Sequence, residues 1–446
     1  MSLSTQRALR VFAICYYAPP QLTPQAIQIG RQLYHLDAAV TLLHGRDPQF
    51  APGYDQYPDF FERIEALAVP NPGPALPGLA HRAAQRLLPL YGSCPDAFGP
   101  WRRRAFAPAL AALAARRPDA LVSFGMPMSD HLLAHALKRR TGLPWLAHFS
   151  DPWADNPFHE TNWLEHQVNA RMEARVIGAA DQVLFTSART LALVMDKYPA
   201  AWRAKAAVLP HAWDMDHFAG PDPAVPAPAA APRHLVRHVI RHIGACYGAR
   251  SPEPLFAALR RIHERTPERL AGVQFEFVGH VSPVFLASAS YRALPAGLVT
   301  LRGQVGYRSS LQLARAAAAL LVIDAPSASA SVFLPSKLVE YIGARRPVWG
   351  ITPAGTSADL IAEWGQGAHN CAAPDDVEAI GRMLVAGIDA LDARAATPFA
   401  GPEAVLGRYA PAEVAAGLKN AIEAAIARAP RTAAQGRAGW GVGDAA

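Results

Sequence analysis

Two side chains in one short stretch, Lys337 and Glu340, have the chemistry to bind a nucleoside diphosphate. They lie one helical turn apart within SVFLPSKLVEYIGARRPVWG, which covers residues 331–350. An ammonium group suits a diphosphate, and a carboxylate can accept hydrogen bonds from the two hydroxyls of a ribose. The same spacing also suits an ordinary ion pair on a solvated helix face, so these residue types leave both interpretations open.

The elements around this pair are predicted to be a strand, a loop, a short helix and a second strand. A buried strand is expected over Ala319–Ile323, because the run is short, apolar and closed by the breaker-rich APSASAS. Pro335 suits the first position of the helix. The N–H groups of the first helical turn lack intrahelical partners, so Pro335, Ser336, Lys337 and Leu338 are predicted to form an anion-binding segment.

The stretch resembles the donor-binding segment of retaining glycosyltransferases of family 4, which have the GT-B fold. The matching motif is FLPSK-L-x-EY followed by RPV, here Phe333–Leu338, Glu340, Tyr341 and Arg346–Val348. The resemblance implies an α/β chain with two doubly wound, Rossmann-like domains facing a central cleft. It also implies transfer of a sugar from a nucleotide-diphosphate sugar to an acceptor hydroxyl, with retention of configuration, in polysaccharide or glycolipid synthesis. Glu340 matches the family's ribose-binding glutamate, whereas Val332 stands where many members have another glutamate.

A second wall of the donor site is expected in the loop after the strand predicted at 236–244. Family members have a basic residue near here on the donor diphosphate and a glycine that makes room for it, and Gly244 and Arg250 match them. The resemblance therefore implies that Arg250 and Lys337 stabilise the leaving diphosphate. The alternative is that Arg250 is a solvated loop residue.

Asp151 is the candidate for acceptor chemistry. It opens the stretch DPWADNP, which resembles a family segment of the form RDPW-x-DNP, with Ser150 in place of the family arginine. Ligands of doubly wound sheets bind at the carboxyl ends of the strands, where Asp151 is predicted to lie. It would orient or help deprotonate the acceptor hydroxyl. An Asx-turn ahead of Pro152 is the structural alternative.

The composition describes a globular chain with a basic surface. Hydrophobic residues make up 51% and charged residues 18% of the 446 residues, and the net charge is +7. A basic surface favours anionic partners, but the sequence has no nucleic-acid-binding signature. The four cysteines are scattered without CxxC spacing, and no apolar run is long enough to span a bilayer. We therefore expect a cytoplasmic protein.

No metal or cofactor is expected. Asp214 and Asp216 have the DxD form that holds a metal in another glycosyltransferase fold, but here they lie in what looks like the closing loop of a first GT-B domain. Three histidines spaced by four, at positions 234, 238 and 242, lack the carboxylate or cysteine companion that a metal site would need. The only small molecule expected is the donor substrate.

Composition and periodicity also predict the domain limits. We expect an acceptor-side domain at 1–218, a Pro/Ala-rich linker at 219–233, a donor domain at 234–404, a helix at 405–428 that returns to the first domain, and a disordered tail at 429–446. Residues 81–117 interleave apolar and arginine side chains. This pattern fits either a helix packed on the sheet or contact with an anionic membrane surface through Trp101, Phe106 and Leu110, at the inner face of the cell membrane.

Two other functions remain compatible with the sequence. The missing first glutamate and the serine at position 150 fit a non-catalytic GT-B protein that binds or assembles components of a polysaccharide pathway. A nucleotide-sugar epimerase of similar fold would need acids and bases on both sides of a sugar carbon, and no convincing set is found. For the favoured enzyme, the partners are a nucleotide sugar and a glycan or lipid-linked acceptor.

Overall fold

The computed structural model describes residues 7–430, except residue 22 and the stretches 47–56, 74–77, 79–81, 83–89, 91–93, 159–161, 216–235, 366–369 and 395–398. The chain forms two compact units. The first comprises residues 1–210 and 411–446, and the second comprises residues 211–410. The predicted linker at 219–233 lies outside the described residues.

The first unit is built on a parallel sheet of seven strands in the order β3-β2-β1-β4-β5-β6-β7. The central strands β4 and β5 are mostly apolar and buried along their whole length, because helices cover both faces of a doubly wound sheet. The strands are β1 (Arg10–Cys15), β2 (Ala39–Arg46), β3 (Glu65–Pro70), β4 (Ala120–Gly125), β5 (Trp145–Phe149), β6 (Gln182–Phe185) and β7 (Ala206–Val208).

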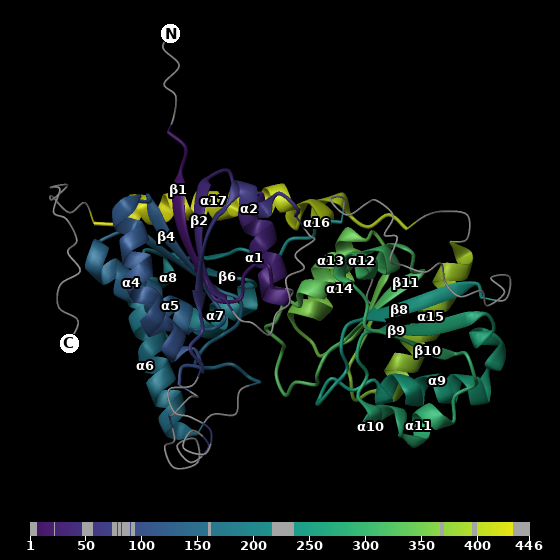
Figure 1. Ribbon diagram of the computed structural model, residues 1–446. Coiled ribbons are helices and arrows are strands. Elements are labelled where there is room, and N and C mark those ends of the chain that lie inside the picture. Colours follow the sequence, from purple (N-terminus) through teal and green to yellow (C-terminus); the bar gives the residue numbers. More distant parts are fainter. Residues whose placement is uncertain are drawn as a thin grey trace, which may run out of the picture. The chain divides into compact units, whose positions relative to one another are not determined.

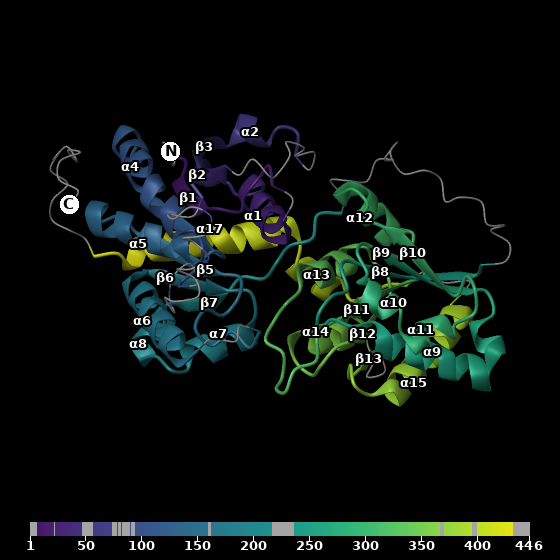
Figure 2. The same ribbon diagram turned by 60° about the horizontal axis from the view of Figure 1, so that its bottom comes forward.

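The helices of the first unit lie on both faces of this sheet (Figure 1). On one face α5 contacts β4, α4 and α6, while on the other α17 runs beside α1 and contacts β4, β5 and β6 (Figure 2). The helices are α1 (Pro24–Tyr34), α2 (Phe60–Arg63), α4 (Gly99–Ala115), α5 (Ser129–Thr141), α6 (Trp163–Ala179), α7 (Ala188–Met195), α8 (Ala200–Arg203) and α17 (Pro411–Arg428).

Helix α4 corrects the membrane interpretation of residues 81–117. Trp101 is fully buried and Leu110 is nearly so, and both belong to the core of the first unit. The Trp101 indole also donates a hydrogen bond to the carbonyl of Val69 at 3.1 Å. Phe106 is only partly buried but packs against the same core. The apolar side chains of α4 therefore stabilise the sheet, and Trp101 and Leu110 cannot enter a bilayer.

The rest of that segment, at 81–93, lies outside the described residues except for two isolated positions. Within the described parts of the chain, no helix has the length and hydrophobicity needed to cross a membrane.

The second unit repeats the architecture with six parallel strands in the order β10-β9-β8-β11-β12-β13. The predicted strand at 319–323 is confirmed as β11, and all five of its residues are buried. The strands are β8 (His238–Ile243), β9 (Val273–Val278), β10 (Val299–Gly303), β11 (Ala319–Ile323), β12 (Val348–Ile351) and β13 (Cys371–Ala372).

Helices cover both faces of the second sheet as well, with α9 packed beside α15 and α12 contacting β8 (Figure 1). Pro335 is the residue that caps α13 rather than its first helical residue, a shift of one position. The helices are α9 (Glu253–Arg265), α10 (Pro283–Leu286), α11 (Ala289–Arg292), α12 (Tyr307–Arg315), α13 (Ser336–Gly343), α14 (Thr356–Gly365), α15 (Val377–Ala393) and α16 (Glu403–Arg408), with a 3-10 turn at Pro267–Leu270.

The single helix expected from 405 to 428 is two helices in the structure. Helix α16 ends at Arg408, and α17 begins at Pro411, where the proline ring fits the first turn but cannot continue a preceding helix. The break coincides with the boundary between the units, because α16 belongs to the second unit and α17 to the first.

Helix α17 should be integral to the stability of the first unit. Leu418 is completely buried, so Leu418→Ala is expected to lower the free energy of unfolding of this unit by about 3 kcal/mol. Faster hydrogen exchange of the β4–β6 amides would report the loss. The control is Glu423→Gln at an exposed position of the same helix, which should change stability by less than about 0.5 kcal/mol. Equal effects of the two variants would show that α17 is not part of this core.

Candidate functional site

The candidate donor site lies at the carboxyl edge of the second sheet, where the strand order reverses between β8 and β11. In doubly wound sheets, the loops that leave two such strands diverge and create a crevice for ligands. The loop after β8 carries Gly244 and Arg250, and the loop after β11 leads into α13 with Lys337 and Glu340. The topology thus brings both predicted walls of the site to one place.

Gly244 is the point at which the two walls approach each other. Its φ is +142°, a conformation that L side chains rarely adopt. A Cβ at this position would lie 3.6 Å from Lys337 Nζ and 3.8 Å from His242 Nε2. A methyl group there would fill the space beside the ammonium group. The backbone conformation therefore requires the glycine, and its missing side chain leaves the space beside the ammonium group open.

Lys337 is a half-buried cation beside a second cation. Burial, and next the positive charge of Arg250, lower the pKa of its ammonium group to about 8, although Asp324 and Cys246 act in the opposite direction. At neutral pH the group still carries its proton. Burial also raises the pKa of the Cys246 thiol to about 11, so that thiol stays neutral beside the two cations.

Neither cation has its charge satisfied by a direct partner within the described part of the chain. There, the side chains of Lys337 and Arg250 make no hydrogen bond and no ion pair, and Arg250 Nε is buried without a partner. The ion pair between Lys337 and Glu340, the alternative left open by the sequence, is absent among these residues. Two unneutralised cations in one crevice favour an anionic ligand.

Glu340 faces α12 instead. The hydroxyl of Tyr307, the first residue of α12, donates a hydrogen bond to Glu340 Oε1 at 2.6 Å. This contact fixes the carboxylate one turn beyond Lys337 on α13. Sequence reasoning missed Tyr307, because the two residues lie 33 positions apart and no local pattern links them.

Tyr341 couples the two walls mechanically, and this role was also missed from the sequence. Its hydroxyl accepts a hydrogen bond from the Ile243 N–H at 2.7 Å and lies 3.2 Å from the Ile243 carbonyl, to which it donates. The ring is 2% exposed. Ile243 ends β8 immediately before Gly244, so the hydroxyl ties the start of the glycine loop to the helix that carries Lys337.

The start of α13 is held by the neighbouring loop. The N–H of Ser331 donates to the carbonyl of Ala354 at 2.7 Å, and the N–H of Thr356 donates back to the carbonyl of Ser331 at 2.9 Å. The first helical N–H groups, those of Ser336 and Lys337, have no intrahelical acceptor by the geometry of a helix. They add partial positive charge to the crevice that already contains Lys337 Nζ.

Asp151 lies in the first unit, two residues beyond the end of β5, at the carboxyl edge of that sheet as predicted. Its loop is anchored to α6 at two points. Glu173 Oε2 accepts the Ala154 N–H at 3.0 Å, and Asn169 Oδ1 accepts the Trp153 indole N–H at 3.0 Å. Glu173 and Asn169 are both buried and were not singled out from the sequence. They tie the loop that carries Asp151 to α6.

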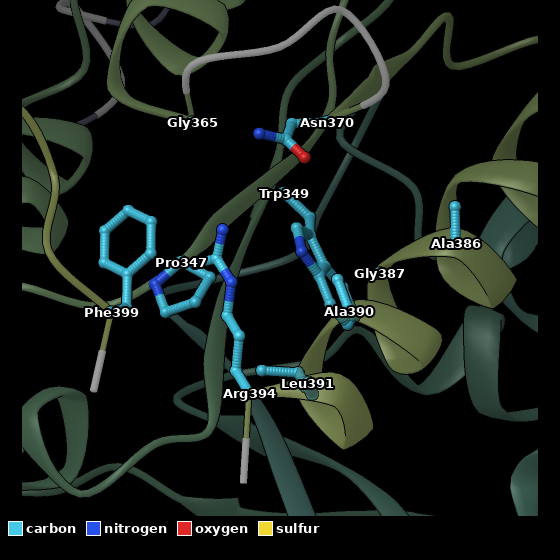
Figure 3. Close-up of a pocket in the computed structure, with 10 residues that line it drawn as sticks. All are labelled: Pro347, Trp349, Gly365, Asn370, Ala386, Gly387, Ala390, Leu391, Arg394 and Phe399. Carbon is cyan, nitrogen blue, oxygen red and sulfur yellow. The ribbon is translucent and has the colours of Figure 1, made fainter. Parts of the chain in front are cut away.

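A separate pocket of the second unit lies at the opposite edge of the sheet, at the strand beginnings (Figure 3). Pro347 and Trp349 at the start of β12 form one wall, and the Arg394 guanidinium lies 5.2 Å from the centre of the Phe399 ring. None of the donor-site residues lines it. The pocket is therefore distinct from the crevice around Lys337.

We compared the sequence and the structure with those of known proteins. No family model matches the sequence, and no curated protein matches it. Solved structures do match: Anabaena HepE in complex with UDP and glucose aligns over 93% of this chain and 99% of that chain, with 13% identity and a TM-score of 0.60. The chain has the GT-B fold. The predicted fold class of two doubly wound α/β units is thus confirmed.

Two further solved structures show the same likeness in fold. The trehalose-6-phosphate synthase OtsA aligns over 93% of this chain and 99% of its own, with 13% identity and a TM-score of 0.59. The lipopolysaccharide outer core galactosyltransferase WaaB aligns over 93% and 99%, with 15% identity and a TM-score of 0.55. At such identities the likeness establishes the GT-B architecture, and the chemistry has to be argued from the residues of the site.

Tyr341→Phe tests the coupling between the two walls. The variant keeps the ring but leaves the partly buried N–H and carbonyl of Ile243 without this partner, so the free energy of unfolding should fall by about 1–3 kcal/mol. Urea denaturation measures this change. Tyr247→Phe is the control, because Tyr247 is 59% exposed in the same loop region and should tolerate the loss of its hydroxyl. If Tyr341→Phe is as stable as the control variant, the hydrogen bonds between Tyr341 and Ile243 contribute nothing to stability.

Proposed function

We propose that the protein is a glycosyltransferase that moves a sugar from a nucleotide-diphosphate sugar to an acceptor hydroxyl. The observation that carries the proposal is the pair of unneutralised cations, Lys337 and Arg250, at the switch point of the second sheet. A diphosphate is the leaving group of such a reaction, and its negative charge increases as the bond to the sugar breaks. Cations fixed at that point stabilise the transition state more than the ground state.

Glu340 would bind the nucleoside part of the donor. Its carboxylate follows Lys337 by one helical turn, and Tyr307 holds it in place at 2.6 Å. A carboxylate so placed can accept both ribose hydroxyls while the phosphates lie over the start of α13. HepE, which has this fold, was solved with UDP and glucose, and this supports a uridine nucleotide as the first donor to test.

Asp151 would act on the acceptor. It follows a central strand of the first sheet, and the contacts of Glu173 and Asn169 fix its loop. In the proposed reaction it orients the acceptor hydroxyl or takes its proton, and Arg250 and Lys337 assist departure of the diphosphate. Retention of configuration and an acceptor on a glycan or lipid-linked sugar are parts of the proposal that rest on the family resemblance alone.

The charge of Lys337 makes donor binding depend on pH in a defined direction. The ammonium group has a pKa of about 8, so it attracts the diphosphate below pH 8 and loses this attraction as the pH rises above it. Calorimetry should show a constant affinity for UDP from about pH 6.5 to 7.5 and a decline above pH 8. Lys337→Ala should lower the affinity at least about tenfold at pH 7 and remove the decline.

Two variants serve as controls for this measurement. Lys337→Arg should keep much of the affinity but lose the break near pH 8, because a guanidinium stays charged throughout. Lys419→Ala removes a partly exposed lysine that pairs with Asp37 in the first unit, and it should leave UDP affinity unchanged. If Lys337→Ala binds UDP as tightly as the unaltered protein, the assignment of the donor site is wrong.

Activity separates an enzyme from a non-catalytic binding protein of the same fold. An enzyme should hydrolyse UDP-sugar slowly in water or transfer its sugar to acceptors in a membrane extract, and Asp151→Ala should abolish transfer while UDP binding persists. Tight UDP binding without transfer to any acceptor would favour the binding role. An epimerase would instead convert one UDP-sugar into another without any acceptor.

A further inference from the structure

A buried histidine lies beneath the proposed phosphate site and is not used by the proposed reaction. His242 is the fifth residue of β8 and is 2% exposed. Its Nδ1 lies 2.9 Å from the carbonyl oxygen of Leu321 on β11. Because a carbonyl can only accept, Nδ1 must carry the proton and donate. This contact fixes the tautomer, and Nε2 is left with a lone pair.

His242 Nε2 and the Lys337 ammonium group lie close to the same point beside Gly244. Nε2 is buried and has no hydrogen-bond partner among the described residues. It and Lys337 Nζ both lie within 4 Å of the position that a Cβ on Gly244 would occupy, at 3.8 Å and 3.6 Å. Of the charged groups around it, Lys337 has the largest effect on the pKa of His242, which burial lowers first of all. The imidazole is therefore neutral next to the ammonium group.

The remaining groups around Lys337 show why a neutral acceptor is useful there. Arg250 and Cys246 face it from the loop after β8, and Asp324 faces it from the end of β11. Asp324 also accepts a hydrogen bond from the hydroxyl of Thr352 at 3.0 Å. A second carboxylate at the position of His242 would cancel the charge of the lysine. An imidazole can orient the ammonium group and leave its charge for an anion.

We propose that His242 is a positioning residue: its unpartnered Nε2 accepts a hydrogen bond from the Lys337 ammonium group when the flexible lysine turns towards it, and this bond then holds the ammonium group over Gly244. Lys337 has a long, flexible stem, and a fixed acceptor limits the directions its ammonium group can take. The three donor hydrogens allow one bond to His242 and others to a ligand. That this ligand is a diphosphate rests on the proposed function, whereas the contact between His242 and Lys337 does not.

The first test measures the pKa of Lys337 without any ligand. Competitive acylation at a series of pH values, read by mass spectrometry, gives the titration midpoint of this one amine. Replacing His242 by phenylalanine removes the acceptor but keeps a ring, so the midpoint should fall by about one pH unit, because the ammonium form loses a charge-assisted hydrogen bond. His242→Gln, which restores an acceptor, should bring the midpoint back to within about 0.3 units of the unaltered protein. An unchanged midpoint in His242→Phe would overturn the proposal.

A second measurement needs no substitution at the buried histidine, in case His242→Phe does not fold. The nitrogen-15 chemical shifts of His242 report its tautomer and whether Nε2 accepts a hydrogen bond. The spectrum should show Nδ1 protonated, and Lys337→Ala should move the Nε2 resonance towards that of an unbonded nitrogen. Lys419→Ala is the control and should move nothing. A resonance that does not respond to Lys337→Ala would contradict the contact.

UDP calorimetry then separates this inference from the proposed function. If both hold, His242→Phe should weaken UDP binding about tenfold at pH 7, and His242→Gln should weaken it much less. If the titration midpoint of Lys337 shifts in His242→Phe but the unaltered protein does not bind UDP, the contact between His242 and Lys337 is supported and the assignment of the donor site is refuted. UDP binding that depends on Lys337, together with an unshifted midpoint in His242→Phe, would support the donor site and refute the role of His242.

Discussion

Two positive charges held in one partly buried crevice are the constraint on which the donor unit depends. Burial disfavours the charged form of Lys337, and the positive charge of Arg250 disfavours it further, so the ammonium group costs free energy in the ligand-free protein. Such an arrangement persists only where the surrounding structure enforces it. An anion that binds between the two charges relieves the repulsion, which is why the crevice is suited to a diphosphate.

The positions of the two cations are fixed by the backbone geometry at two glycines and by the hydroxyl of Tyr341. Gly244 adopts a φ of +142°, and a Cβ on the neighbouring Gly279 would lie only 2.4 Å from the Gly244 carbonyl oxygen. These two strand ends can therefore approach each other only as glycines. Tyr341 then joins the end of β8 to α13 through both polar groups of Ile243. The position of Lys337 relative to Gly244 follows from these contacts rather than from the lysine itself.

Much of the fold could be predicted from the sequence because local signals are strong where a sheet is buried. The apolar run at 319–323 and its closing breakers predicted β11 residue for residue. The environment of residues with long-range partners was harder to predict from the sequence. The interleaved apolar and arginine residues around Trp101 left core packing and membrane contact both open, and the structure shows that Trp101 is a core residue of the first unit. The break before Pro411 was overlooked because apolar periodicity continues across it.

In the candidate site too, residues with a local sequence signal could be predicted and those with long-range partners could not. Gly244, Arg250, Lys337 and Glu340 could be proposed from a motif and from their places after predicted strands, and the topology brings these strands together. Tyr307 and His242 carry no such signal. Tyr307 reaches Glu340 from another helix, and His242 matters only because its tautomer is fixed by a carbonyl on β11. Hydrogen bonds of this kind depend on the packed structure and have no counterpart in local sequence.

The most direct measurement is a crystal structure of the protein with UDP. The account predicts phosphate oxygens within about 3.2 Å of both Lys337 Nζ and the Arg250 guanidinium, with a ribose hydroxyl bonded to Glu340. A UDP molecule bound elsewhere, or bound here with both cations turned away from its phosphates, would contradict the account.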